Sequence, residues 1–202
     1  IIANAPFKST KQQSRFFGLG DEFNENSLAP DLSQLLSDNQ TAHLSDGFLT
    51  LAPTEKQLLV EKMLEIVVAE RSVSGTFTGT TRIDFAKMKL DEFAGISAYS
   101  WRENAVGISF GNGKIFTWRR EDGKQKEIAH ADLPANQSAI YLRIKAQGGE
   151  IFEFADSIDG KSWQTVGDKI NFGNLEGARL AVIYNGKTTN VGARFDWLRV
   201  EQ

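Results

Sequence analysis

The sequence has 202 residues, of which 41% are apolar and 24% are charged, and its formal net charge is −3. A chain of this length can bury a sizeable core within one domain. The near balance of 23 basic and 26 acidic residues leaves no electrostatic footprint for nucleic acid or an anionic membrane surface, so neither is expected as a partner.

Cysteine is absent from the sequence, which excludes disulfides, thiolate metal sites and a cysteine nucleophile. No apolar run approaches the roughly 20 residues that a membrane helix needs, so no membrane span is expected. The start of the sequence has neither a charged n-region nor a full apolar h-region, as in a chain that has lost a signal peptide or an upstream domain. The absence of cysteine leaves the compartment open; our expectation is an extracytoplasmic location, either periplasmic or secreted.

The beginning of the chain differs in character from the rest. Residues 1–17 are mixed and polar, so we expect a linker or an N-terminal tail there, followed by one domain over residues 18–202. Short strands are expected within 20–24 and 44–51. The stretch 54–71 is ambiguous, because strong helix formers in its first half favour a short helical turn, whereas β-branched residues in its second half favour strands.

Pairs of Asn or Asp with Gly recur along the sequence, and such pairs accept the positive φ angles of two-residue hairpin turns. The pairs are Asp46-Gly47, Asn112-Gly113, Asp122-Gly123, Asp159-Gly160 and Asn185-Gly186. Alternation of apolar and polar residues predicts further strands in the second half of the chain. These strands are 93–101, 105–110, 114–120, 139–147, 150–157, 164–166, 180–184 and 192–200. The sequence therefore predicts an all-β, antiparallel protein.

The two-residue period of a strand assigns side chains to opposite faces. In 139–147 it places Leu142 and Ile144 in the core and Tyr141 and Arg143 on the other face. Aromatic rings stack on sugar rings and charged groups hydrogen-bond to hydroxyls, so an outward face with both is suited to carbohydrate. The predicted carbohydrate-binding residues are Tyr99, Trp101, Tyr141, Arg143 and Glu153. The alternative is that these aromatic residues cover a sheet edge or pack beneath a loop.

The remaining tryptophans, Trp118, Trp163 and Trp197, are expected in the core. No catalytic residue is predicted: Glu153 and Asp156 fall on opposite faces of an ideal strand, whereas glycoside hydrolysis needs two carboxylates opposed across the bond. The acids of the terminal strands could instead hold calcium if these strands are neighbours. The candidate ligands are Asp21, Glu22 and Asp196, with a backbone carbonyl such as that of Gly47. The alternative is that these are ordinary surface acids.

Several short motifs occur in an order that resembles one family. They are Gly20-Asp21-Glu22-Phe23-Asn24, Thr81–Met88 followed by Phe93–Ile96, Tyr141–Ile144, the Phe152–Trp163 hairpin and Ala193–Val200. Together they resemble the concanavalin A-like domain at the C-terminus of glycoside hydrolase family 43 β-xylosidases and arabinofuranosidases. The chain departs from the family pattern in having no tryptophan before Trp101 and an insertion-like stretch at 54–64.

The resemblance implies a two-sheet jelly-roll sandwich with adjacent first and last strands. It also implies a structural calcium at Glu22, Asp196 and the Gly47 carbonyl. In the family the hydrolytic residues belong to a separate five-bladed propeller, which is not among these 202 residues. We expect a non-catalytic carbohydrate-binding or ancillary domain of a polysaccharide-degrading system. Its expected partners are a xylan-like or arabinan-like polysaccharide and a catalytic glycoside hydrolase domain.

Two alternatives from other classes stay open. One is a glycoside hydrolase whose carboxylates converge only in the fold. The other is a structural or protein-interaction sandwich, which would expose an apolar patch rather than a cluster of polar and aromatic groups.

Overall fold

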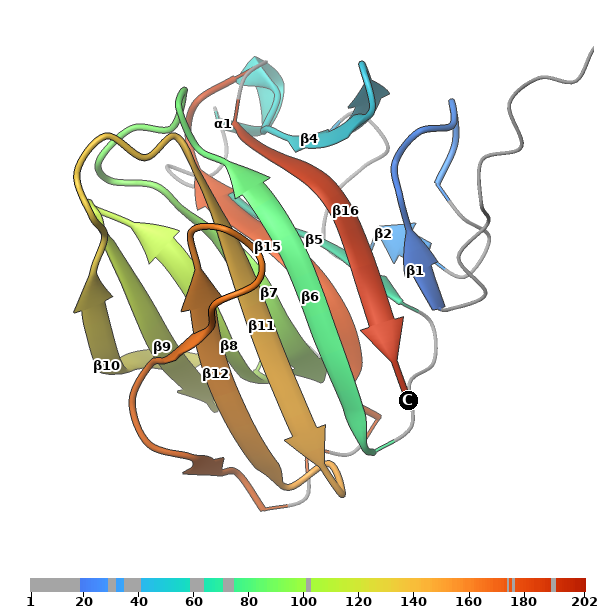
Figure 1. Cartoon of the computed structure of the whole chain (residues 1–202). Helices are drawn as coiled ribbons and strands as arrows, with labels where there is room; N and C mark the ends of the chain where they lie inside the picture. Colours follow the sequence, from blue (N-terminus) through green and yellow to red (C-terminus); the bar gives the residue numbers. More distant parts are fainter. Residues whose placement is uncertain are drawn as a thin grey trace, which may run out of the picture.

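The computed structural model describes residues 19–28, 32–34, 41–58, 64–70, 75–100, 103–173, 175, 177–189 and 192–202. Nearly all regular structure in these residues is β-strand, and the strands form two antiparallel sheets that pack face to face (Figure 1). The predicted all-β jelly-roll sandwich is confirmed. Among the described residues, no helix is long and apolar enough to cross a membrane.

The first sheet has nine strands. Its order is β13 (Gln164–Thr165), β12 (Ile151–Ser157), β11 (Ala139–Gln147), β6 (Phe77–Asp84), β16 (Ala193–Glu201), β4 (Phe48–Leu51) and β3 (Ala42–Ser45). Two short strands lie off this path: β1 (Leu19–Asp21) pairs with β16, and β14 (Ile170–Asn171) pairs with β12. The first and last strands are thus adjacent, with Leu19 opposite Val200.

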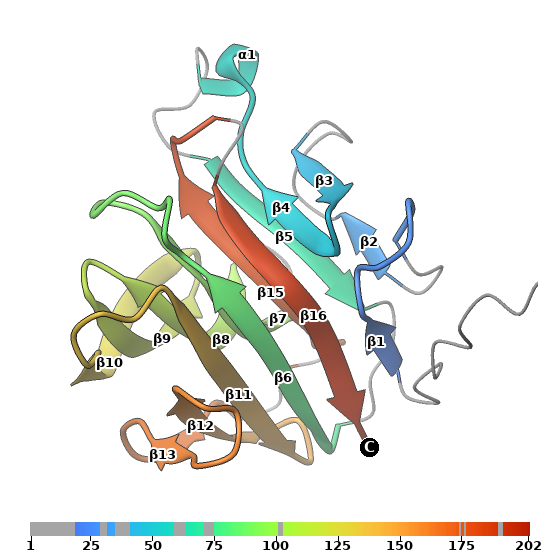
Figure 2. The same cartoon turned by 45° about the horizontal axis from the view of Figure 1, so that its top comes forward.

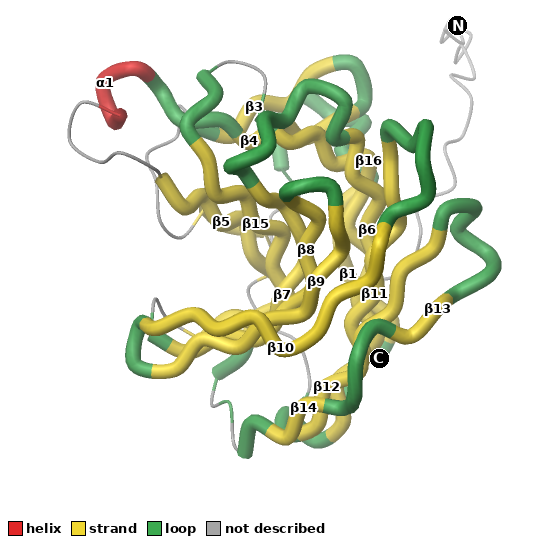
Figure 3. The backbone as a smooth tube through the Cα atoms, turned by 90° about the vertical axis from the view of Figure 1, so that its left-hand side faces the viewer, coloured by secondary structure: helices red, strands yellow, loops and turns green. Residues whose placement is uncertain are grey.

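The second sheet has seven strands. Its order is β10 (Lys124–Asp132), β9 (Lys114–Glu121), β8 (Asn104–Gly111), β7 (Phe93–Ser100), β15 (Arg179–Gly186), β5 (Leu64–Glu70) and β2 (Leu32–Gln34). Figure 3 views the molecule from the side, with β7 to β10 in one layer and β6, β11 and β16 in the other. Each sheet therefore has one face toward the other sheet and one face away from it, which we call its outer face.

The hydrophobic core lies between the sheets and follows from the two-residue period of the strands. Along β11, buried residues alternate with more exposed ones, and Leu142 and Ile144 are inaccessible to solvent. Ile96 of β7 and Ile108 of β8 belong to the same buried cluster and meet them from the opposite sheet. Burying one such side chain contributes about 1.5–3 kcal/mol. This burial fixes which residues of each strand remain on the outer faces.

Three of the predicted turn pairs close hairpins, at Asp46-Gly47, Asn112-Gly113 and Asp122-Gly123, and both residues of each pair have positive φ. Asp159-Gly160 lies in a longer connection between β12 and β13, where only the glycine has positive φ. Asn185-Gly186 does not form a turn, because it ends β15 and pairs with β5. The dipeptide alone does not distinguish a turn from the end of a strand.

The stretch 54–71, for which a helical turn and a strand were both predicted, contains one of each. Thr54 caps the helix α1 (Glu55–Leu58). Its hydroxyl accepts a hydrogen bond from the Gln57 amide, and the Gln57 side chain accepts one from the Thr54 amide. The strand β5 follows. In contrast, β10 was not predicted, because most of its residues are polar and exposed. Charged residues are typical of an edge strand, where they discourage pairing with another chain.

A buried carboxylate joins two connections at one end of the sandwich. Glu92 is 1% exposed and accepts hydrogen bonds from the amides of Lys89, Lys187 and Thr188 and from the Thr188 hydroxyl. Burial by itself would raise the pKa of Glu92, but these hydrogen bonds outweigh it and lower the pKa. The segment before β7 is thereby fixed to the segment after β15.

We expect Glu92→Gln to reduce the free energy of unfolding by about 1–3 kcal/mol at neutral pH, because the donors stay buried and lose a charged acceptor. Folding lowers the pKa of Glu92, so its stabilisation is complete above the ordinary value of 4.5 and is lost as pH falls through the lowered value. Urea denaturation over this pH range should show the two proteins converging in acid. Asp122→Asn is the control, since Asp122 is exposed in the β9–β10 turn, away from Glu92. A difference that is independent of pH would contradict this assignment.

Candidate ligand-binding surfaces

Three of the five predicted carbohydrate-binding residues lie together on the outer face of the nine-stranded sheet. Tyr141 and Arg143 alternate with core residues along β11, and Glu153 occupies the outer face of β12. Strands β11 and β12 are neighbours in the sheet (Figure 1). Lys145 lies directly across from Glu153 in the register of the two strands. All of these positions are at least partly exposed to solvent.

Two tryptophans that were expected in the core also belong to this face. Trp163 precedes β13, and the guanidinium carbon of Arg143 lies 4.2 Å from its ring centroid. Trp197 follows a β-bulge in β16, the strand that Figure 2 shows between β6 and β4. Because the bulge inserts one extra residue, Phe195 faces the core while Trp197 faces outward. The core prediction was therefore wrong for both tryptophans.

The aromatic rings and arginines on this face form a group that we call the arginine–aromatic strip. It consists of Arg82, Tyr141, Arg143, Trp163, Trp197 and Arg199. The ring centroids of Tyr141 and Trp197 are 6.3 Å apart, and Arg199 lies 4.2 Å from the Trp197 centroid. Arg82 lies 5.8 Å from the Tyr141 centroid. Contacts of this kind hold the guanidinium planes in fixed orientations.

Most charges near the strip are paired. Arg199 donates two hydrogen bonds to the carboxylate of Glu22, at 2.6 and 2.8 Å, and this interaction raises the pKa of Arg199. Arg82 contacts Asp196 at 3.3 Å. The ion pair between Glu153 and Lys169, at 2.7 Å, lowers the pKa of Glu153. These pairs are half-exposed, so each adds little stability but orients its side chains.

Tyr99 lies on the other side of the molecule. Along β7, Ala98 joins the core and Tyr99 faces outward from the seven-stranded sheet, where it is only 2% exposed. It packs in a second cluster with Trp118, whose indole N–H donates to the Ser109 hydroxyl. The predicted residues therefore do not share one face, because they come from two sheets. Trp101 lies outside the described residues.

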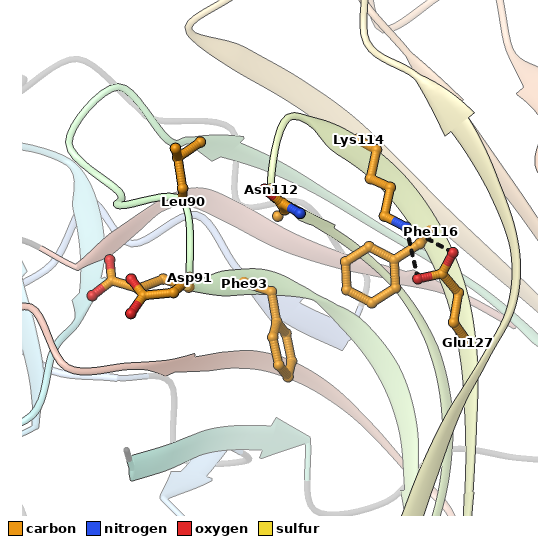
Figure 4. Close-up of a pocket in the computed structure, with 9 residues that line it drawn as sticks. Leu90, Asp91, Phe93, Asn112, Lys114, Phe116 and Glu127 are labelled. Atoms are coloured by element: carbon orange, nitrogen blue, oxygen red, sulfur yellow. Dashed lines mark hydrogen bonds and ion pairs between the residues drawn. The ribbon is translucent and has the colours of Figure 1, made fainter. Parts of the chain in front are cut away.

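An open pocket of about 440 Å³ lies at one end of the outer face of the seven-stranded sheet (Figure 4). Phe93 and Phe116 contact each other edge to face in this pocket, with ring centroids 5.9 Å apart. Lys114 and Glu127 form an ion pair at 2.8 Å on its wall. This pocket was not predicted from the sequence. Strand alternation did carry a signal for it, because both phenylalanines alternate with core residues of their strands and therefore face outward.

Glu153 and Asp156 do not form a hydrolytic pair. Glu153 is on the outer face, whereas Asp156 is 6% exposed on the inner face, where burial raises its pKa. In the part of the chain that the structure describes, no group of three or more His, Cys, Asp or Glu residues could hold a metal ion. These positions do not bring carboxylates together across a cleft, as glycoside hydrolysis requires.

The carboxylates of the predicted calcium ligands Glu22 and Asp196 are already paired with arginines. Both oxygens of Glu22 accept hydrogen bonds from Arg199, and Asp196 contacts Arg82. Gly47 lies in the β3–β4 turn, close to the side chain of Asn24. Calcium binding would require the carboxylates to exchange guanidinium partners for a metal ion. As they stand, these residues do not fit a calcium site, and the calcium itself remains an untested prediction.

We expect the melting temperature to be the same in chelator and in excess calcium, because arginines already neutralise Glu22 and Asp196. Differential scanning calorimetry under the two conditions provides the measurement. A ligand that binds only the folded state raises its melting temperature. A lower melting temperature in chelator would therefore support the calcium site, and Asp196→Asn would show whether this residue contributes to it.

Comparison with known proteins relates this fold to one family of domains. No curated protein matches the chain. A xylan β-1,4-xylosidase from Bacillus halodurans superposes with a TM-score of 0.71 at 19% identity, covering 100% of this chain and 41% of that one. A bifunctional GH43-CE protein of Bacteroides eggerthii gives a TM-score of 0.69 at 21% identity, covering 90% and 27%.

A third solved structure has the same fold. The exoplasmic/lumenal domain of VIP36, in a form bound to Ca²⁺ and Man3GlcNAc, gives a TM-score of 0.57 at 10% identity, covering 86% of this chain and 84% of that one. Identities this low establish the fold alone. The sequence family of β-xylosidase C-terminal concanavalin A-like domains matches residues 20–201. This chain, which spans less than half of the glycoside hydrolases that it resembles, belongs to that family of C-terminal concanavalin A-like domains.

Proposed function

We propose that this domain is a non-catalytic module of a polysaccharide-degrading glycoside hydrolase and that it binds glycan on the arginine–aromatic strip. The family to which the chain belongs is associated with glycoside hydrolase systems. The observation that carries the proposal is the grouping of Tyr141, Trp163 and Trp197 with guanidinium groups on one sheet face. An extracytoplasmic location, where polymeric glycan is encountered, belongs to the same proposal.

The chemistry of the strip suits a sugar polymer. Aromatic rings offer apolar faces to the C–H groups of a sugar ring, while charged side chains hydrogen-bond to its hydroxyls. The strip runs across β16, β6 and β11 to Trp163 beside β13, so its groups are spread over several strands. An extended ligand could therefore contact several of them at once. This arrangement favours a chain of sugars over a single small molecule.

The lengths of the solved structures that this chain resembles favour a second role, in which the domain braces a catalytic domain. The chain covers 41% of the xylosidase and 27% of the bifunctional protein that it resembles, so most of each neighbour lies outside the matched domain. Tryptophan and arginine are also enriched at protein interfaces. A catalytic glycoside hydrolase domain is therefore the proposed protein partner, and the outer faces of both sheets are available to it as contact surfaces.

Affinity gel electrophoresis in xylan, arabinan and β-glucan tests the binding role. We expect at least one polymer to retard the domain and Trp163→Ala and Trp197→Ala each to weaken binding roughly two- to tenfold, the value of one aromatic contact. Phe116→Ala is the matched control, because it removes a half-exposed aromatic ring from the opposite sheet. Loss of binding in the control alone would transfer the site to the pocket. If no polymer retards the unmodified domain, glycan binding is wrong.

A further inference from the structure

Four arginines on the outer face of the nine-stranded sheet each lie over an aromatic ring. The four pairs are Arg82–Tyr141, Arg143–Trp163, Arg194–Phe48 and Arg199–Trp197. Three of them also contact a carboxylate: Arg82 contacts Asp196 at 3.3 Å, Arg194 contacts Asp84 at 3.8 Å, and Arg199 contacts Glu22 at 2.6 Å. Arg143 is the exception.

Arg143 has a stacking partner but no hydrogen-bond or carboxylate partner among the described residues. Its guanidinium carbon lies 4.2 Å from the Trp163 centroid. The nearest acid along the adjacent strand, Glu153, is held by Lys169 at 2.7 Å. Burial lowers the pKa of Arg143, and the attraction of Glu153 and Glu201 does not offset it. The guanidinium is therefore a partly desolvated cation whose charge is not neutralised locally.

The residues paired with Arg143 across the sheet carry no charge that would compete with an external anion. Its direct cross-strand neighbours are Thr80 on β6 and Ala155 on β12, neither of which is charged or large. Lys145, two residues further along the same face, adds positive charge. Arginine presents its N–H donors in a planar fork that matches the two oxygens of a carboxylate. Stacking on Trp163 restrains this plane, so less conformational entropy is lost when an anion binds.

We propose that Arg143 binds the carboxylate of a uronic acid residue, so that the strip recognises an acidic rather than a neutral polysaccharide. This inference rests on the proposed glycan binding and specifies its substrate class. Tyr141 lies two residues from Arg143 on the same face, roughly 7 Å away along the strand, which is about the width of one sugar ring. A sugar whose carboxylate reaches Arg143 would therefore have an aromatic ring beside it. An acidic side chain of a protein lacks a ring that would use this neighbour.

Isothermal titration calorimetry tests the inference with two matched polymers, a xylan that carries glucuronic acid groups and the same xylan after chemical reduction of its carboxylates. We expect the domain to bind the acidic polymer about tenfold more tightly or better, as for a hydrogen bond between charged groups. Arg143→Gln should abolish this difference. Arg143→Lys should lose most of it, because lysine lacks the fork. Arg194→Gln is the control and should retain it, since Arg194 already has a carboxylate partner.

The outcomes separate the two proposals. Equal binding of both polymers by the unmodified domain overturns acid recognition but leaves glycan binding intact. No binding of either xylan overturns acid recognition, and glycan binding is overturned as well if arabinan and β-glucan also fail to retard the domain. Poly-glutamate serves as the protein-like anion. If it competes for the domain as well as the acidic xylan does, Arg143 recognises carboxylates of a protein partner and the sugar assignment is wrong. Melting temperatures of the variants must match that of the unmodified domain, so that loss of binding reports on the site.

Discussion

The packing of the two sheets against each other is the constraint on which the other features of this molecule depend. Leu142 and Ile144 of β11 are inaccessible to solvent because they meet Ile96 and Ile108 of the opposite sheet. A shift of one residue in the register would expose this set and bury the alternate positions, including Arg143. Burying an unpaired guanidinium is costly, so the register that fills the core also holds Arg143 at the surface.

A single irregularity in β16 extends this face. The bulge between Phe195 and Trp197 lets Phe195 remain in the core while Asp196 and Trp197 are both directed outward. Asp196 then contacts Arg82, and Trp197 supports Arg199. Without the extra residue, either Asp196 or Trp197 would point into the core, and its contact on the outer face would be lost. The strip is therefore a consequence of local backbone geometry as well as of strand alternation.

The two outer faces differ in physical character. The face of the nine-stranded sheet carries half-exposed rings covered by guanidinium groups, most of which are paired with acids. The face of the seven-stranded sheet carries a buried apolar cluster around Tyr99 and Trp118, with an open pocket at one end. The first face therefore offers exposed, oriented polar groups, whereas most of the aromatic surface of the second is buried within the chain.

Sequence patterns determined a large part of this structure. Alternation along β11 identified its core residues, and three Asx-Gly pairs located hairpins, because both signals depend only on neighbouring residues. Alternation also assigned Tyr141, Arg143 and Glu153 correctly to the outer side of their strands. The edge strand β10 escaped prediction, since its polar residues satisfy no burial pattern.

What the sequence could not decide was which strands share a sheet. Alternation places Tyr99 and Tyr141 outward equally well, but only the tertiary structure shows that they lie on opposite sides of the sandwich. The bulge that exposes Trp197 and the stacking of Trp163 on Arg143 likewise depend on strand pairing and on contacts across strands. The sequence by itself therefore determined the fold class and the inward or outward direction of most side chains, because these follow from local periodicity. The grouping of side chains into a surface was decided by non-local pairing, which local periodicity does not encode.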